Sequence, residues 1–91
     1  MKELQTRRFT EQIEDILKSD FSQKLIFNKE IVTSAKVNTK SKLTTPKINA
    51  LMAMSESWDF DKVEISRSGA GLKIEFLEFN KAKAASKTIV N

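Results

Sequence analysis

The stretch TTPKINALMAMSESWDFDKVEISRSGAGLKIEFLEF, residues 44–79, predicts a capped helix followed by a β-hairpin. Thr45 is expected to cap the helix with its hydroxyl group, and Pro46 suits the first helical position, where its missing N–H costs nothing. Apolar side chains then recur at helical spacing as far as Trp58. The first part of the stretch therefore predicts a helix from Pro46 to Ser57.

The second part of the stretch has the period of a strand. Val63 and Ile65 alternate with polar residues, and the segment 67–71, which contains both glycines of the chain, is expected to turn it. Apolar residues alternate again over residues 72–76, but after Phe76 they continue on the opposite parity. This change predicts either a bulge or a strand end that is covered on both faces.

The N-terminal half is less uniform. A helix over residues 3–19 is predicted by one apolar stripe, which consists of Phe9, Ile13, Ile16 and Leu17. Two interpretations of residues 19–37 stay open. We prefer a short strand at 25–27 followed by a helix over 29–36, but the β-branched residues from Ile31 onward would equally suit a strand. The polar segment 38–44 is expected to be a loop.

These elements define a small α+β protein. The 91 residues suffice for one domain, which we place at residues 1–79, followed by a basic, weakly ordered tail at 80–91. The predicted fold has two or three helices followed by a C-terminal β-hairpin. In architecture alone this order resembles a winged helix-turn-helix, with the helix 46–57 as recognition helix and the segment 67–71 as the tip of the wing.

Composition excludes several functions. The chain has no cysteine and no histidine, so disulfides, thiolate metal sites and histidine bases are absent. We therefore expect no enzyme activity, no cofactor and no metal site. The longest apolar run, Ala50 to Met54, is far too short to span a membrane. The N-terminus lacks the apolar core of a secretory signal, so a cytoplasmic protein is the expectation.

The positive charge is concentrated in two segments. The net charge is +4, yet residues 1–35 are neutral and residues 56–80 are acidic. Residues 36–55 carry four lysines and no acidic residue, and residues 81–91 carry three more lysines. The first of these basic segments leads into a helix N-terminus, where free N–H groups and the helix dipole favour anions.

This distribution leads to the main functional hypothesis, a non-catalytic nucleic-acid-binding protein, DNA rather than RNA, such as a transcription regulator. The predicted contact residues are Lys36, Lys40, Lys42, Thr45, Lys47, Asn49 and Arg67. A solvated loop whose lysines serve only solubility is the competing interpretation. The alternative function is a small adaptor or inhibitor that binds a protein through the Phe9/Ile13/Ile16 face or a hairpin edge. A homodimer is a further alternative.

Overall fold

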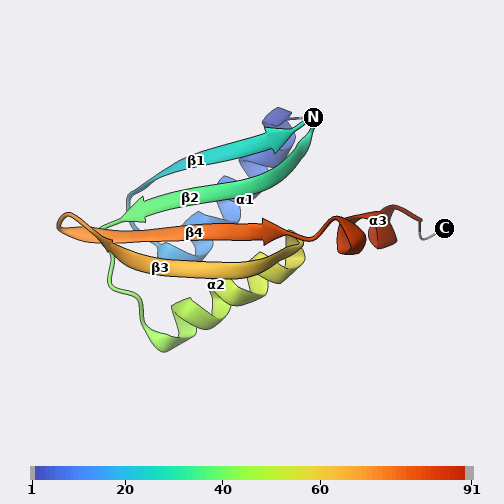
Figure 1. Cartoon of the computed structure of the whole chain (residues 1–91). Coiled ribbons are helices and arrows are strands. Elements are labelled where there is room, and N and C mark those ends of the chain that lie inside the picture. The colour runs from blue at the N-terminus through green and yellow to red at the C-terminus, as the bar shows by residue number, and fades with distance from the viewer. Residues whose placement is uncertain (1, 90–91) are drawn as a thin grey trace.

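The computed structural model describes the chain from Lys2 to Ile89, and side chains as far as Ala85. The elements, in order, are α1 (Lys2–Leu17), β1 (Phe21–Asn28), β2 (Ile31–Thr39), α2 (Thr45–Ser57), β3 (Phe60–Ser68), β4 (Gly71–Phe79) and α3 (Lys81–Ile89). The four strands form one antiparallel sheet in the order β1-β2-β4-β3 (Figure 1). The chain thus repeats a helix–hairpin unit twice, and β2 and β4 join the two hairpins at the centre of the sheet.

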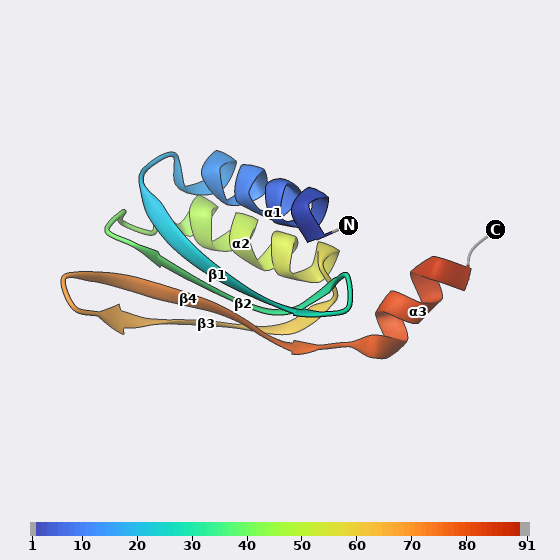
Figure 2. The same ribbon diagram turned by 90° about the horizontal axis from the view of Figure 1, so that it is seen from above.

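The helices α1 and α2 cover one face of the sheet and leave the other face open (Figure 2). Below, the covered face is called the inner face and the open one the outer face. The core between the layers contains Phe9, Ile13 and Leu17 of α1, Leu51 and Met54 of α2, and Val37, Ile74 and Phe76 of the central strands. The α1 stripe predicted from the sequence is therefore confirmed as a packing face.

Aromatic side chains join the two layers at one end of the core. Phe9 packs edge-on against both Trp58 and Phe76, with ring centroids 5.2 and 5.4 Å apart. Phe60 lies 5.8 Å from Phe76 and is almost fully buried. The indole N–H of Trp58 donates a hydrogen bond to Gln12 Oε1 at 2.8 Å, so this half-buried ring has its polar group paired.

The winged helix-turn-helix prediction is wrong. The strands do not form a single hairpin after the helices, because a first hairpin, β1–β2, already follows α1. The predicted helix 29–36 is also wrong, since these residues belong to the β1–β2 turn and to β2. The β-branched residues from Ile31 onward favour a strand here, because β2 pairs with a strand on each side. Branched side chains pack best in such a central strand.

The helix predicted at 46–57 is confirmed as α2, but its cap is not the predicted one. Thr44 occupies the N-cap position with extended backbone, and its side chain makes no capping hydrogen bond. Thr45 is already the first helical residue, so Pro46 stands one position later than expected. The first turn of α2 is held by the backbone bond from the Ile48 N–H to the Thr44 carbonyl oxygen, 2.9 Å long.

The β3–β4 hairpin is confirmed, with longer strands and a shorter turn than predicted. Gly69 has a φ of 59°, which tight two-residue turns require at their first central position. The β3–β4 register runs without a shift past Phe76, so the predicted bulge is absent and Leu77 points to the outer face. Glu78, whose φ of 59° is left-handed, kinks the strand between Leu77 and Phe79. This kink leaves the β3–β4 register unchanged and lets Phe79 pack 6.1 Å from Phe60.

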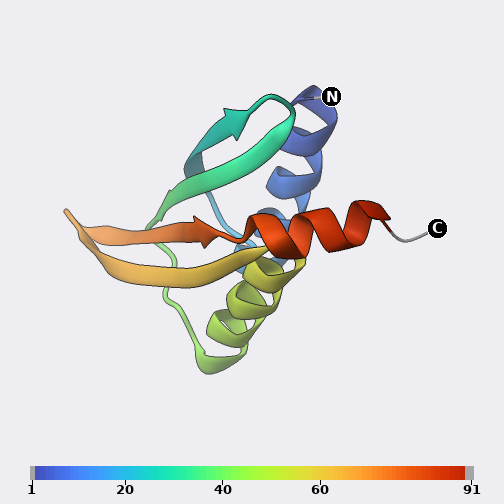
Figure 3. The same ribbon diagram turned by 45° about the vertical axis from the view of Figure 1, so that its right-hand side comes forward.

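The region predicted as a weakly ordered tail contains α3, which projects from the body of the molecule (Figure 3). Asn80 begins this connection, and its side chain donates to Asp61 Oδ2 at 2.9 Å. Lys83 forms an ion pair with Asp61 Oδ1 at 3.1 Å. Both contacts tie the start of α3 to β3. The domain limits remain a prediction, and residues 90–91 lie outside the described part of the chain.

Candidate nucleic-acid interface

One end of the sheet brings together three segments that are far apart in the sequence. Residues Phe21, Thr39, Leu72 and Arg67 lie side by side in one row across the four strands. This row places the β3–β4 turn beside the 40–44 loop and the 18–20 connection, as Figure 1 shows at the left of the sheet. We call this region the hairpin-tip end. It encloses a hollow of about 540 Å³.

The hairpin-tip end is held by close backbone packing. A Cβ atom at Gly71 would press on the Thr39 carbonyl oxygen, so glycine allows the hairpin to approach the end of β2. The Thr39 hydroxyl accepts a hydrogen bond from the Ser41 N–H at 3.0 Å and donates one to the Asp20 carbonyl oxygen at 3.3 Å. These bonds fix the loop that carries Lys40 and Lys42.

Lys47 joins α2 to the end of α1 and to the 40–44 loop at this end. Its ammonium group donates to the Leu17 carbonyl oxygen at 3.0 Å and to Ser41 Oγ at 3.1 Å. The first contact caps the C-terminus of α1, where a positive charge also complements the helix dipole. Lys47 therefore has a structural role that the sequence pattern did not reveal, although its charge still contributes to the local potential.

The remaining basic side chains at the hairpin-tip end are exposed. Lys18, Lys40, Lys42 and Arg67 are all exposed. Arg67 stands in the row of Leu72 and Thr39, so its side chain is on the inner side of the sheet. Within the part of the chain that the structure describes, none of these four side chains forms an ion pair. Asp20 lines the same hollow as Lys40 and is the acidic residue in its lining. The hairpin-tip end thus carries an excess of positive charge.

Lys36 lies on the outer face of the sheet instead, within β2. It faces Lys24 on β1 and Glu75 on β4 across the sheet. At about 3.3 Å per residue, its Cα lies roughly 13 Å along the strand direction from that of Lys40. The outer face of β1 and β2 therefore carries two lysines, with Glu75 of β4 beside Lys36.

Two predicted contact residues and the tail lie elsewhere. Thr45 is exposed in the first turn of α2, and Asn49 is exposed one turn later, on the helix layer rather than on the open sheet face. Lys81 and Lys83 belong to α3 at the opposite end of the molecule (Figure 2). The basic tail and the basic loop therefore do not share one surface, and Lys83 is paired with Asp61.

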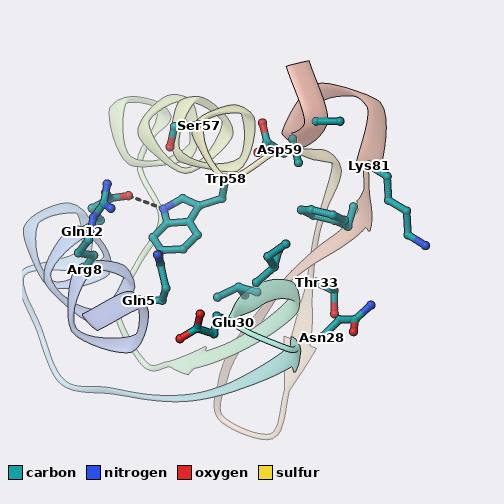
Figure 4. Close-up of a pocket in the computed structure, with 15 residues that line it drawn as sticks. Gln5, Arg8, Gln12, Asn28, Glu30, Thr33, Ser57, Trp58, Asp59 and Lys81 are labelled. Atoms are coloured by element: carbon teal, nitrogen blue, oxygen red, sulfur yellow. Dashed lines mark hydrogen bonds between the residues drawn. The ribbon is translucent and has the colours of Figure 1, made fainter. Parts of the chain in front are cut away.

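A second hollow, which the sequence did not indicate, lies at that opposite end. It has a volume of about 730 Å³ and lies between α1, the β1–β2 turn and α3. Trp58, Ile31 and Phe79 form its apolar part, and Figure 4 shows Gln5, Arg8 and Glu30 around its mouth. Ile31 is half exposed there. This hollow could not be recognised from the sequence, because its wall is formed by α1 together with β2, and β2 was predicted to be a helix.

The described residues hold no group of three acidic, histidine or cysteine side chains that could bind a metal ion. None of the described helices has the length and apolarity needed to cross a bilayer. The chain matches no protein-family model, no curated protein and no solved structure.

Proposed function

We propose that this chain binds the phosphate backbone of a nucleic acid, with duplex DNA as the first target, through the hairpin-tip end. The observation that carries the proposal is the cluster of exposed, unpaired cations there, namely Lys18, Lys40, Lys42 and Arg67. They come from two loops and the end of β3, which backbone packing holds together, so little ordering is needed on binding. Neutralised phosphates release counterions, which supplies the free energy of such complexes.

The charge pattern of the outer face favours one direction for the bound strand. Lys24 and Lys36 place two cations on β1 and β2. On the β3 side the lysines are matched by acids, with Lys62 3.0 Å from Glu64. A polyanion that contacts the hairpin-tip end is therefore expected to continue over β1 and β2 and to avoid β3.

Binding is expected to be independent of base sequence. No aromatic side chain is among the exposed outward-facing strand residues in the described chain, so bases have no platform on which to stack. The helix α2 packs behind the sheet and is not available as the recognition helix of a winged fold. Lysine contacts to phosphate position a protein on nucleic acid without reading bases.

The alternative, an adaptor that presents the α1 stripe, does not suit this structure. Phe9 and Ile13 are fully buried in the core of their own chain, so that face is occupied. The other route of the alternative, a sheet edge, remains open.

A charge-reversal experiment tests the proposal. The triple variant Lys40→Glu, Lys42→Glu, Arg67→Glu should lower the affinity for a duplex DNA at low salt by more than about tenfold. The matched control, Lys2→Glu, Lys29→Glu, Lys81→Glu, makes the same change in net charge at the opposite end and should bind far better. Equal losses in the two variants would show that only net charge matters and would refute a site at the hairpin-tip end.

A further inference from the structure

The hollow between α1, the β1–β2 turn and α3, called the α3-end hollow below, has the size of a small-molecule site. Its volume of about 730 Å³ falls within the usual range of roughly 300–1,000 Å³ for such sites. Trp58, Ile31 and Phe79 supply its apolar lining. The indole N–H of Trp58 already donates to Gln12, so the ring offers its apolar surface to a ligand. Aromatic pairs gain from stacked or edge-on contact, and a ligand with an aromatic ring therefore fits this lining.

Two residues with unfavourable backbone conformations meet beside this hollow. Asp59, which lines it, has a φ of 67°, and Glu78, which precedes the lining residue Phe79, has a φ of 59°. The Asn80 N–H donates to the Asp59 carbonyl oxygen at 2.7 Å, which brings both positions together where α3 leaves the sheet. Left-handed conformations are costly for residues other than glycine, and they concentrate at functional sites. The backbone therefore marks the same end of the molecule as the hollow does.

Among the described charged groups that line the hollow, Arg8 is the one left for a ligand. Glu30 and Asp59 each have an interaction partner already. Lys81 extends away from the hollow in Figure 4. Arg8 is exposed, and among the described residues it has no ion-pair partner. The hollow therefore carries an uncompensated positive charge beside its apolar lining, and this combination favours an anionic ligand.

We propose that the α3-end hollow binds a small aromatic carboxylate, with its ring against Trp58 and its carboxylate on Arg8. Figure 4 shows Arg8 on α1, on the same side of Trp58 as Gln12. A guanidinium group holds a carboxylate through two parallel hydrogen bonds, which fixes the orientation of the ligand. An apolar lining with a few convergent polar groups is the usual design of a small-molecule site. The proposal does not depend on nucleic-acid binding, because the hollow and the hairpin-tip end lie at opposite ends of the molecule.

The first test uses hydrocinnamate, which combines a phenyl ring with one carboxylate. Trp58 is the only tryptophan of the chain, so its fluorescence reports on this hollow directly. A ligand of this size should bind the full chain with a Kd on the order of 1 mM. Hydrocinnamyl alcohol keeps the ring without the charge and should bind about tenfold more weakly. The absence of a saturable fluorescence change up to about 20 mM hydrocinnamate, or equal binding of acid and alcohol, overturns the proposal.

The second test compares two neighbouring arginines of α1. Arg8→Gln removes the cation of the hollow and should weaken hydrocinnamate binding about tenfold, while binding of the alcohol stays the same. Arg7→Gln makes the same change at an exposed position outside the lining and should bind both compounds as wild type does. Circular dichroism of both variants confirms that they fold. Unchanged binding in Arg8→Gln, or equal weakening in the two variants, refutes the contact with Arg8.

The third test locates the ligand by its effect on α3. Ala84 and Ala85 of α3 line the same hollow as Arg8 of α1, so a ligand that fills it joins the two helices. Saturating hydrocinnamate should therefore slow amide hydrogen exchange in residues 81–85 and leave the β3–β4 turn unchanged. If exchange slows only at that turn, or does not slow in residues 81–85, the ligand lies outside this hollow and the proposal is wrong.

Discussion

Gly71 shows how one residue shapes the hairpin-tip end. Because a methyl group there would press on the Thr39 carbonyl oxygen, Gly71→Ala should lower the free energy of unfolding by about 2 kcal/mol. Gly69→Asn is the control. Gly69 has open space around it and a left-handed φ that asparagine tolerates, so its change should be small. Urea denaturation measures both. A Gly71→Ala protein as stable as wild type would contradict the close approach of the hairpin to β2.

Lys47 has a structural role, in contrast to the exposed cations that are proposed to bind phosphate. Lys47→Met keeps the aliphatic stem but removes the hydrogen bonds to Leu17 and Ser41, so stability should fall by about 1 kcal/mol. Lys42→Met, at an exposed position, should leave stability within about 0.5 kcal/mol of wild type. The comparison uses chemical denaturation. If Lys42→Met is the more destabilising variant, the assigned role of Lys47 is wrong.

At the scale of elements, Glu78 marks the end of β4. A left-handed φ costs an ordinary residue about 1 kcal/mol, and glycine avoids most of this cost. Glu78→Gly should therefore raise the thermal midpoint or leave it unchanged, although the Lys62–Glu78 pair at 3.8 Å is lost. Glu64→Gly, in the middle of β3, should lower it. A clear loss of stability in Glu78→Gly would mean that the kink is not strained.

The attachment of α3 should depend on pH at both extremes. Hydrogen bonds from Lys83 and Asn80 lower the pKa of Asp61 below 3.8, so this tie contributes above that pH and is lost as the pH falls through the lowered value. The hydrogen bond that Lys83 donates to Asp61 raises the pKa of Lys83 above 10.5. The tie is therefore present below 10.5 and is lost again as the pH rises through the raised pKa. The tie is complete between these limits.

Asp61→Asn tests the same attachment at neutral pH. It should speed amide hydrogen exchange in residues 81–85, because the charged partner of Lys83 is gone. Glu64→Gln, which removes the partner of Lys62 instead, should leave exchange in α3 unchanged. Similar exchange in both variants would contradict the role of Asp61.

The elements that were predicted correctly have strong signals in their local sequence. The α1 stripe, the Pro46 start of α2 and the two glycines of the β3–β4 turn each act over a few residues. The β1–β2 turn lacks such a signal, because its left-handed position is occupied by Lys29, with a φ of 59°, rather than by glycine. Without a visible turn the sequence favours a helix over 29–36, so of the first hairpin only the short strand at 25–27, which lies inside β1, is predicted correctly.

At the scale of the whole molecule, that one hairpin changes the topology. A helix at 29–36 would have produced a winged fold with an exposed recognition helix, whereas β2 completes a sheet that α1 and α2 cover on one face. The same change moved Lys36 to the open sheet face and left Lys40, Lys42 and Arg67 together at its end. The basic segment was predictable from the sequence, but its separation from the tail lysines depends on pairings between distant strands.

The salt dependence of DNA binding tests the central claim most directly. The slope of log affinity against log salt reports the number of phosphates neutralised, at about 0.9 per contact on duplex DNA. If Lys40, Lys42 and Arg67 contact phosphate, their joint replacement by glutamine should reduce the magnitude of this slope by about 2.7. An unchanged slope would contradict the account, because the cations of the hairpin-tip end would then take no part in binding.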